Sequence, residues 1–311
     1  MTIQTRSHAG AFVPHYPGSS VQTAAWAAVA VAGLLIVMKA VAYVITGSIA
    51  MMASLADSGL DLFGSTINLL AIYQALAPAD SEHRFGHGKA EPLAGLAQGA
   101  FIAGSATFLV IESASRLIAP HPITHGVAGV VVMVISIIAV LFLVVFQRLA
   151  VRRTGSLAIG ADLLHYLGDL LTNIGVIAGI VLSTRFGLLI ADPIVGLVVA
   201  VILSAGAWHV FRQSYDQLMD HELPENDRAR IKEIVMSHRG VRSLHDLRTR
   251  AAGISTFIQL HIELDPAISL ISAHELSDLV EADIRTAFPN SEIIIHQDPA
   301  GVESPPALSR S

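Results

Sequence analysis

The chain has 311 residues, of which 53% are hydrophobic and only 14% are charged, and its mean hydropathy is +0.60. A soluble domain usually carries about 25% charged residues, so this composition predicts a membrane protein. The sequence contains no cysteine, which excludes disulfides and thiolate metal sites and disfavours binding of copper(I).

The charge differs between the two parts of the chain. Residues 1–213 contain 10 Lys and Arg against 9 Asp and Glu, a net charge of +1, whereas residues 214–311 contain 9 against 16, a net charge of −7. The first part is therefore apolar and nearly neutral, and the second is expected to be an acidic, water-exposed domain. Neither part shows a basic face, so we expect no nucleic-acid partner.

Residues 1–20 are polar and contain Gly, Pro and Ser, so we expect a flexible N-terminal tail. Six apolar segments follow, and each reaches the roughly 20 residues that a membrane-spanning helix needs. They cover approximately residues 21–46, 50–77, 91–117, 126–147, 156–184 and 192–212. The sequence thus predicts an α-helical membrane protein with a six-helix bundle at residues 21–213, embedded in the lipid bilayer.

The basic residues of the short loops predict the orientation of these helices. The loop at 78–90 contains two Lys or Arg and the loop at 148–155 contains three, whereas the loops on the opposite side contain few. Lys and Arg are enriched in cytoplasmic loops. We therefore expect a multi-pass protein of the cell inner (plasma) membrane with both termini in the cytoplasm.

The acidic part predicts a second, small domain at residues 214–300. Its pattern changes from long apolar runs to short elements, and residues 257–265 alternate between apolar and polar side chains as a half-buried strand does. The expected order is helix, strand, strand, helix, strand, at residues 225–238, 241–250, 257–265, 270–288 and 292–298. This order predicts a small two-layer α+β (αββαβ) cytoplasmic domain, followed by a disordered tail at 301–311.

Two pairs of ionisable residues lie inside apolar segments. Asp57 and Asp61 are four residues apart, as are His165 and Asp169, so each pair shares one face of its helix. An ionisable group at membrane depth costs about 2.5–3.5 kcal/mol, and both pairs fall near the expected midplane. Three carboxylates and one imidazole can hold a divalent metal ion tetrahedrally, which indicates metal transport; the alternative is a set of interhelical hydrogen bonds. Asp162, one turn before His165, is either an entrance residue or a solvated interfacial one.

Two further groups have the spacing of metal ligands. The polar loop contains Asp80, His83 and His87, three and four residues apart, although a solvated loop without metal has the same pattern. The second domain contains a candidate metal cluster, which competes with the interpretation that its histidines are ordinary exposed side chains. The members of this cluster are His245, His261, His274, His296 and Asp298.

No motif of an enzyme is present, since the sequence has no HExxH zinc motif, no GxSxG elbow and no P-loop. A metalloenzyme also needs an open ligand position, which a closed four-ligand site lacks. We therefore expect no enzymatic activity. The alternative to a transporter is a membrane-bound metal sensor or metal-binding regulatory protein, which would use the second domain without a midplane site.

The longest distinctive stretches of the chain are SLADSGLDLFGSTINLLAI, FGHGKAEPLAGLAQG, ADLLHYLGDLLTNIGV, HDLRTR and IIIHQDP. With them, residues 22–302 resemble the cation diffusion facilitator family, and within it the bacterial zinc/iron(II) exporters. The resemblance implies a homodimeric antiporter that exchanges divalent metal ions for protons, with six membrane helices and a metallochaperone-like α+β domain. It implies zinc, or another divalent metal, as cargo and as regulatory ligand.

The resemblance also assigns residues. It implies a transport site at Asp57, Asp61, His165 and Asp169, a loop site at Asp80, His83 and His87, and the cytoplasmic cluster named above, with Gln297 adjacent. It implies a salt link between Lys89 and Asp220 at the dimer interface. Many zinc-dedicated members have His where Asp57 stands, and Asp at this position resembles the group that also handles iron(II) and cadmium.

Overall fold

The computed structural model describes residues 18–47, 49–118, 127–186 and 190–301. Most of the two expected tails, 1–20 and 301–311, lies outside these residues. The described chain forms two compact units. A helical unit contains residues 18–221 together with 250–254, and an α+β unit contains the remaining described residues from 222 onward.

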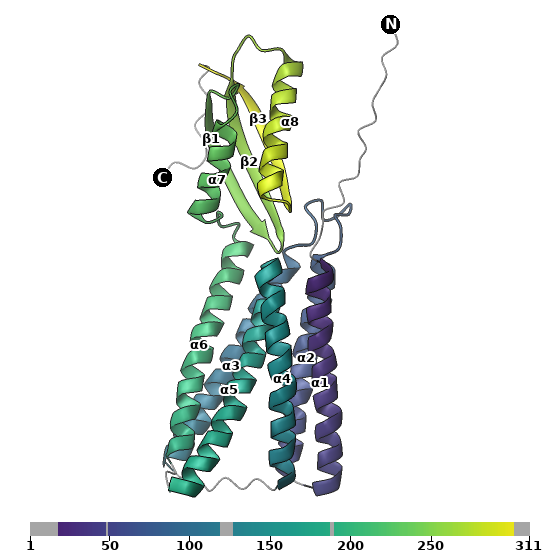
Figure 1. Cartoon of the computed structure of the whole chain (residues 1–311), viewed down its shortest axis with the longest axis vertical. Helices are drawn as coiled ribbons and strands as arrows, with labels where there is room; N and C mark the ends of the chain where they lie inside the picture. The colour runs from purple at the N-terminus through teal and green to yellow at the C-terminus, as the bar shows by residue number, and fades with distance from the viewer. Residues whose placement is uncertain (1–17, 48, 119–126, 187–189, 302–311) are drawn as a thin grey trace. The chain divides into compact units, whose positions relative to one another are not determined.

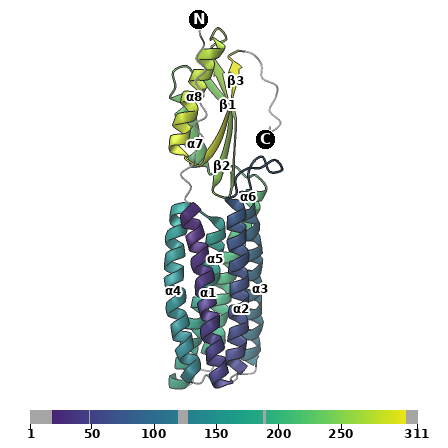
Figure 2. The ribbon, with the colours of Figure 1, turned by 90° about the vertical axis from the view of Figure 1, so that its right-hand side faces the viewer.

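The helical unit consists of six long helices of 27 to 30 residues that lie side by side (Figures 1 and 2). They are α1 (Gly18–Thr46), α2 (Ile49–Ala75), α3 (Ala90–Ile118), α4 (Val127–Thr154), α5 (Leu157–Phe186) and α6 (Ala191–Leu218). All six expected apolar segments are therefore helical. Helices α4 and α6 continue past the expected ends at 147 and 212, because hydropathy marks the end of the apolar surface and the following polar residues are still good helix formers.

Four helices of the described part are long and apolar enough to cross a membrane by length and composition, namely α1, α3, α4 and α6. The other two long helices, α2 and α5, carry the ionisable pairs singled out in the sequence. A charged or polar residue inside a span lowers its hydropathy without removing the need for every backbone group to be hydrogen-bonded within the helix. Helices α2 and α5 therefore carry their polar residues within otherwise apolar segments.

Close approach of α5 and α6 depends on two glycines. A Cβ atom built on Gly168 would lie 2.6 Å from Leu203, and one built on Gly206 would lie 2.6 Å from Leu164. Each glycine thus receives a leucine of the facing helix, which is the small-residue packing that brings membrane helices together. This contact fixes α5, the helix that carries His165, against α6.

The α+β unit has the expected element order, with α7 (Glu225–Met236), β1 (Ser243–Ala252), β2 (Ser255–Leu264), α8 (Leu270–Ala287) and β3 (Ser291–Pro299). The sheet order is β1-β2-β3, and β2 pairs with β3 in parallel, so that His261 lies opposite His296 and Glu263 opposite Asp298. The predicted alternation of β2 is confirmed: its apolar residues Ile258, Leu260, Ile262 and Leu264 are buried in the core with α7 and α8. The polar residues therefore lie on the other face of the sheet.

The α+β unit has its own core, so a fragment of residues 222–301 should fold alone. In this fragment Ile262→Ala should lower the free energy of unfolding by about 2–4 kcal/mol, because it removes a fully buried side chain. Urea denaturation followed by circular dichroism measures this change. The matched control is Ile294→Ala on β3, where the isoleucine is 51% exposed and the expected loss is below about 1 kcal/mol. Equal losses would contradict the assigned core.

Candidate functional site

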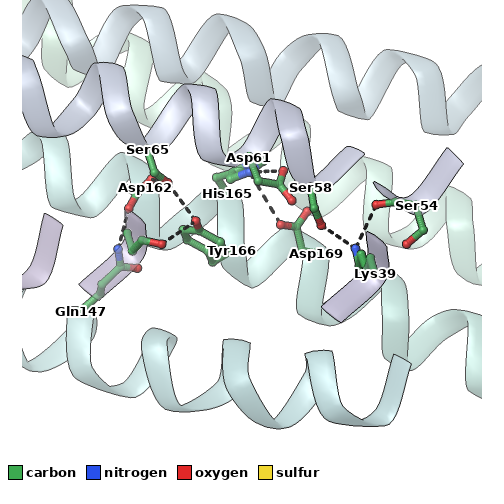
Figure 3. Close-up of polar contacts among 11 residues, drawn as sticks. Lys39, Ser54, Ser58, Asp61, Ser65, Gln147, Asp162, His165, Tyr166 and Asp169 are labelled. Carbon is green, nitrogen blue, oxygen red and sulfur yellow. Dashed lines mark hydrogen bonds and ion pairs between the residues drawn. The ribbon is translucent and has the colours of Figure 1, made fainter. Parts of the chain in front are cut away.

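The centre of the helical unit contains a cluster of two carboxylates and one imidazole (Figure 3). His165 Nε2 lies 3.1 Å from Asp61 Oδ1 and 3.6 Å from Asp169 Oδ2. Each of the three residues offers one ligand atom, and these atoms all lie within 4.8 Å of one another. Such a set of one nitrogen and two oxygens is a partial tetrahedral site for a divalent metal ion.

Two helices position this cluster. Asp61 is the thirteenth residue of α2, and His165 and Asp169 are the ninth and thirteenth of α5, so all three lie near the middle of their helices. The four-residue spacing stacks His165 and Asp169 on one face of α5, directed toward α2. Asp61 and His165 are buried, whereas the side chain of Asp169 is 30% exposed. The cluster is therefore enclosed on one side and accessible at Asp169.

The fourth predicted ligand is placed differently. Asp57 lies one turn before Asp61 on α2 and is exposed at the surface of the helical unit. It is not among the three residues whose ligand atoms lie within 4.8 Å of one another. The described geometry therefore supplies three converging ligands and one carboxylate a helical turn away.

Asp162 belongs to a separate buried network next to the cluster. Gln147 Nε2 donates a hydrogen bond of 2.6 Å to Asp162 Oδ2, and the Ser65 hydroxyl donates one of 3.4 Å to Oδ1. Ser65 is also 2.8 Å from the hydroxyl of Tyr166, whose ring lies 5.4 Å from that of His165. Because Asp162 is completely buried, it is not a solvated interfacial residue. This network joins α2, α4 and α5. It also holds Tyr166, the residue that follows His165, in place.

A buried cation that was not predicted from the sequence lies near the cluster. Lys39 on α1 is 8% exposed, and its Nζ donates hydrogen bonds to the Ser58 hydroxyl (2.6 Å) and to the Ser54 carbonyl (3.1 Å), both on α2 (Figure 3). The sequence does indicate this residue, because Lys39 is ionisable and lies inside the apolar segment 21–46. Ionisable residues are rare at membrane depth.

The polar loop brings its three candidate ligands together. Asp80 Oδ1 lies 3.4 Å from His83 Nδ1 and Asp80 Oδ2 lies 3.4 Å from His87 Nε2, and all three residues offer ligand atoms within 4.8 Å. Hydrogen bonds from the backbone amides of His83 and Glu82 hold the pKa of Asp80 below its usual value. His87 Nδ1 is buried and has no hydrogen-bond partner among the described residues. An ionised carboxylate and the two imidazole nitrogens that lie close to it are suited to a metal ion.

The exposed face of the sheet gathers four of the five predicted cytoplasmic ligands. Asp298 Oδ2 lies 2.9 Å from His261 Nδ1 and 3.2 Å from His245 Nε2, and Asp298 Oδ1 lies 3.2 Å from His296 Nε2. Burial opposes ionisation of Asp298, but the hydrogen bond from His261 and the charges of His296, His261 and His245 outweigh it and lower its pKa. The carboxylate is therefore ionised at neutral pH and central to the group.

Two residues assigned with this cluster lie elsewhere in the described structure. His274 is exposed on α8, 3.6 Å from Asp278. The Gln297 side chain is directed toward α8, where Nε2 donates a hydrogen bond of 2.7 Å to the Ser277 hydroxyl. Glu263, which was not predicted as a ligand, has its Oε1 3.8 Å from His245 Nδ1. Its position two residues after His261 places it on the same face of β2, which the strand period indicates.

The two residues of the expected salt link form an ion pair within the chain, and its place at a dimer interface stays a prediction. Lys89 Nζ lies 2.9 Å from Asp220 Oδ1, and Arg250 Nη1 lies 3.1 Å from the same oxygen. Burial opposes ionisation of Asp220, but its hydrogen bonds from Lys89 and Arg250 and their charges lower its pKa. Arg250 also lies 5.2 Å from the centre of the Phe85 ring. The link therefore has a third, cationic member that the sequence analysis did not name.

Comparisons with known proteins cover both units. Residues 25–219 match the family described as the cation efflux transmembrane domain, and residues 223–300 match the cytoplasmic domain of cation efflux proteins. The chain is 43% identical over 288 residues to the cation-efflux pump FieF of Cronobacter sakazakii, covering 93% of this chain and 96% of that protein.

The FieF protein of Shewanella oneidensis is 45% identical over 283 residues, covering 91% of this chain and 95% of that protein. A solved structure of CzrB in its zinc form is 30% identical and covers 28% of this chain and 99% of that chain, with a TM-score of 0.25. The two FieF proteins thus span nearly the whole of this chain, whereas the CzrB structure covers only part of it.

The geometry of the sheet predicts which residues hold zinc in the α+β unit. In the full-length protein, Asp298→Asn should weaken zinc binding by about tenfold or more, because Asp298 is the carboxylate that three histidines share. The control is His274→Ala, which removes an imidazole outside the group and should have a smaller effect. Isothermal titration calorimetry measures both. Equal loss in the two variants would mean that α8 contributes to the site.

Proposed function

The chain belongs to the cation efflux family, also called the cation diffusion facilitators, and we propose that it exports divalent metal ions from the cytoplasm in exchange for protons. It is an integral membrane protein with a transmembrane cation-efflux domain and a cytoplasmic dimerisation domain, and efflux of divalent metal cations is the activity of its family. Beyond the activity of the family, we propose the coupling ion, the preferred metal and the orientation of the protein in the membrane.

The observation that carries the proposal is the meeting of Asp61, His165 and Asp169 in the middle of α2 and α5. Ionised groups at this depth are expensive unless they are paired or bind an ion. Asp57, one turn away and exposed, supplies the fourth ligand when its part of α2 turns toward the cluster. The loaded site then contains three carboxylate oxygens and one imidazole nitrogen, which closes a tetrahedral coordination sphere.

Proton exchange follows from the chemistry of these four groups. Metal binding requires a neutral imidazole and ionised carboxylates, so a metal ion that enters must displace the protons held there. After the site opens to the other side of the membrane, protons from that side displace the metal. Either protons or a metal ion balance the carboxylates throughout the cycle, which avoids an empty buried cluster of negative charge.

The ligand set favours zinc, with iron(II) or cadmium as further substrates. Imidazole suits zinc, and the additional carboxylate at Asp57 makes the site harder and more tolerant of iron(II). Asp80, His83 and His87 provide a secondary site in an exposed loop. The group around Asp298 provides a regulatory zinc site that stabilises the homodimer. We place both termini in the cytoplasm and the protein in the inner membrane, in agreement with the basic loops.

A pure metal sensor is the second candidate function, since the α+β unit has its own ligand group. A sensor has no need for ligands in the middle of two transmembrane helices, so the central cluster favours transport. Zinc flux into proteoliposomes separates the two functions, because a sensor binds zinc without moving it.

Asp61→Ala and Asp169→Ala should each reduce zinc flux into proteoliposomes at least about a hundredfold, because each removes a converging ligand. The control is Glu112→Gln on α3, which changes another carboxylate of a transmembrane helix, one that pairs with Arg116 away from the cluster. The control should retain most of the parent flux. Near-normal flux in both aspartate variants, with insertion and dimerisation intact, would disprove the assignment of the site.

Proton coupling predicts that an acidic lumen drives zinc uptake into inside-out membrane vesicles. Uptake should rise with the imposed pH difference and should release protons into the medium, which a pH-sensitive dye outside the vesicles measures. His165→Asp replaces the only nitrogen ligand, so it should shift the preference from zinc toward iron(II) and change the pH profile. Zinc flux that does not respond to the pH difference would indicate a uniporter instead.

A further inference from the structure

Lys39 places a positive charge inside the helical unit, seven residues before the end of α1. The residue is more than nine-tenths buried, and none of the ion pairs among the described residues includes it. Two hydrogen bonds hold its Nζ to α2, one to the Ser58 hydroxyl and one to the Ser54 carbonyl. A buried ammonium without a paired carboxylate is costly, so its position requires negative charge nearby.

The nearby negative charge is that of the central cluster. Ser58, which accepts the hydrogen bond, directly follows Asp57 and lies three residues before Asp61. The charge of Lys39 acts on both Asp57 and Asp169. Figure 3 shows Lys39 and Ser58 beside the group of Asp61, His165 and Asp169. The two serine oxygens hold the ammonium close to the ligands but do not let it pair directly with one of them.

We propose that Lys39 is a fixed counter-cation that sets the charge selectivity of the transport site. The carboxylates of Asp57, Asp61 and Asp169 with the ammonium of Lys39 carry a net charge of minus two when His165 is neutral. One divalent cation cancels this charge, so the loaded site is neutral and suited to a low-dielectric interior. Asp162 lies outside this set of four groups: Gln147 and Ser65 donate hydrogen bonds to its carboxylate, and its contribution is the same in the parent and in the Lys39 variants.

This charge balance determines both the binding and the release of the metal. Without Lys39 the loaded site would keep one negative charge, so it would hold a divalent ion more tightly and release it more slowly. With Lys39 the attraction is weaker and the ion can leave when protons arrive. Lys39 therefore lowers the affinity of the site for the metal ion and speeds release of the ion in each transport cycle. The inference rests on the proposed function of the central cluster as the transport site.

The test compares Lys39→Met with Lys39→Arg in the full-length protein. The loop and cytoplasmic ligand groups are first disabled by His87→Ala and Asp298→Ala, so that the remaining zinc site is the central one. Lys39→Met removes the charge and should tighten zinc binding by about tenfold, with slower flux at saturating zinc. Lys39→Arg keeps the charge and should bind zinc as the parent does. A purely structural role of Lys39 predicts weaker binding in both variants, the opposite direction for Lys39→Met.

A compensating pair of variants tests the charge balance independently. Asp57→Asn removes one negative charge and one ligand, so it should weaken zinc binding. Adding Lys39→Met to Asp57→Asn restores the net charge of minus two, so the double variant should bind zinc more tightly than Asp57→Asn alone. If Lys39→Met does not fold, Lys39→Gln takes its place in both comparisons, since its amide can still donate to Ser58.

Two results would overturn the inference: binding by Lys39→Met, or by its Gln substitute, that equals or falls below that of the parent, and a double variant no tighter than Asp57→Asn. The failure of the proposed function looks different. In that case the parent with disabled outer sites binds no zinc at all, or binding survives Asp61→Ala unchanged. Zinc binding by the parent with disabled outer sites, and by its Asp61→Ala variant, therefore tests the proposed function before any change is made at Lys39.

Discussion

The cost of ionised groups inside the helical unit determines how its helices are joined. His165 is shared between Asp61 and Asp169, and Asp162 is held by Gln147 and Ser65. With the bonds from Lys39 to α2, these contacts link α1, α2, α4 and α5 through polar side chains. Each link satisfies a group that would otherwise be buried without a partner. The need to satisfy buried ionised groups therefore explains both the polar side chains between these four helices and the way the helices pack together.

Helix α3 is attached to this group at one end by another buried carboxylate. Glu91, in the first turn of α3, accepts hydrogen bonds from the Ser156 hydroxyl and from the Ala158 amide at the start of α5. A carboxylate at a helix N-terminus satisfies free amides and interacts favourably with the helix dipole. Because His87 precedes Glu91 by four residues, the same contact fixes the chain just after the loop ligands. The position of the loop site thus depends on the packing of α3 against α5.

Patterns that repeat along one element could be predicted from the sequence. The six long helices, the alternation of β2 and the four-residue pairs on α2 and α5 all follow from hydropathy and spacing. Contacts between distant segments could not: Lys39 meets Ser58 and Gln147 meets Asp162 only because whole helices pack in one arrangement. For the same reason the sequence does not predict that Asp61 is buried while Asp57, one turn earlier on the same face of α2, is exposed.

The cytoplasmic cluster shows the same limit within a single small unit. The buried residues of α8 are Ala273, Ser277, Val280 and Ile284, and this stripe turns His274 away from the sheet. The strand period already separates Gln297 from its neighbours His296 and Asp298, since adjacent residues of β3 face opposite sides. The resemblance groups all of these residues by sequence position, whereas the described geometry groups them by face. Strand alternation therefore decides the ligand set more directly than proximity along the chain.

The three ligand groups differ most in burial, and burial determines how each can exchange an ion. The loop group is mostly exposed and the group on the sheet is half-buried, so water can replace a departing metal in both. The central group contains two buried residues, where attraction between charges is strongest and a bound ion is hardest to release. A transport site at this depth therefore needs a second positive charge to take the place of the metal. In the proposed cycle protons supply this charge when the metal leaves, and Lys39 offsets part of the negative charge of the same carboxylates throughout.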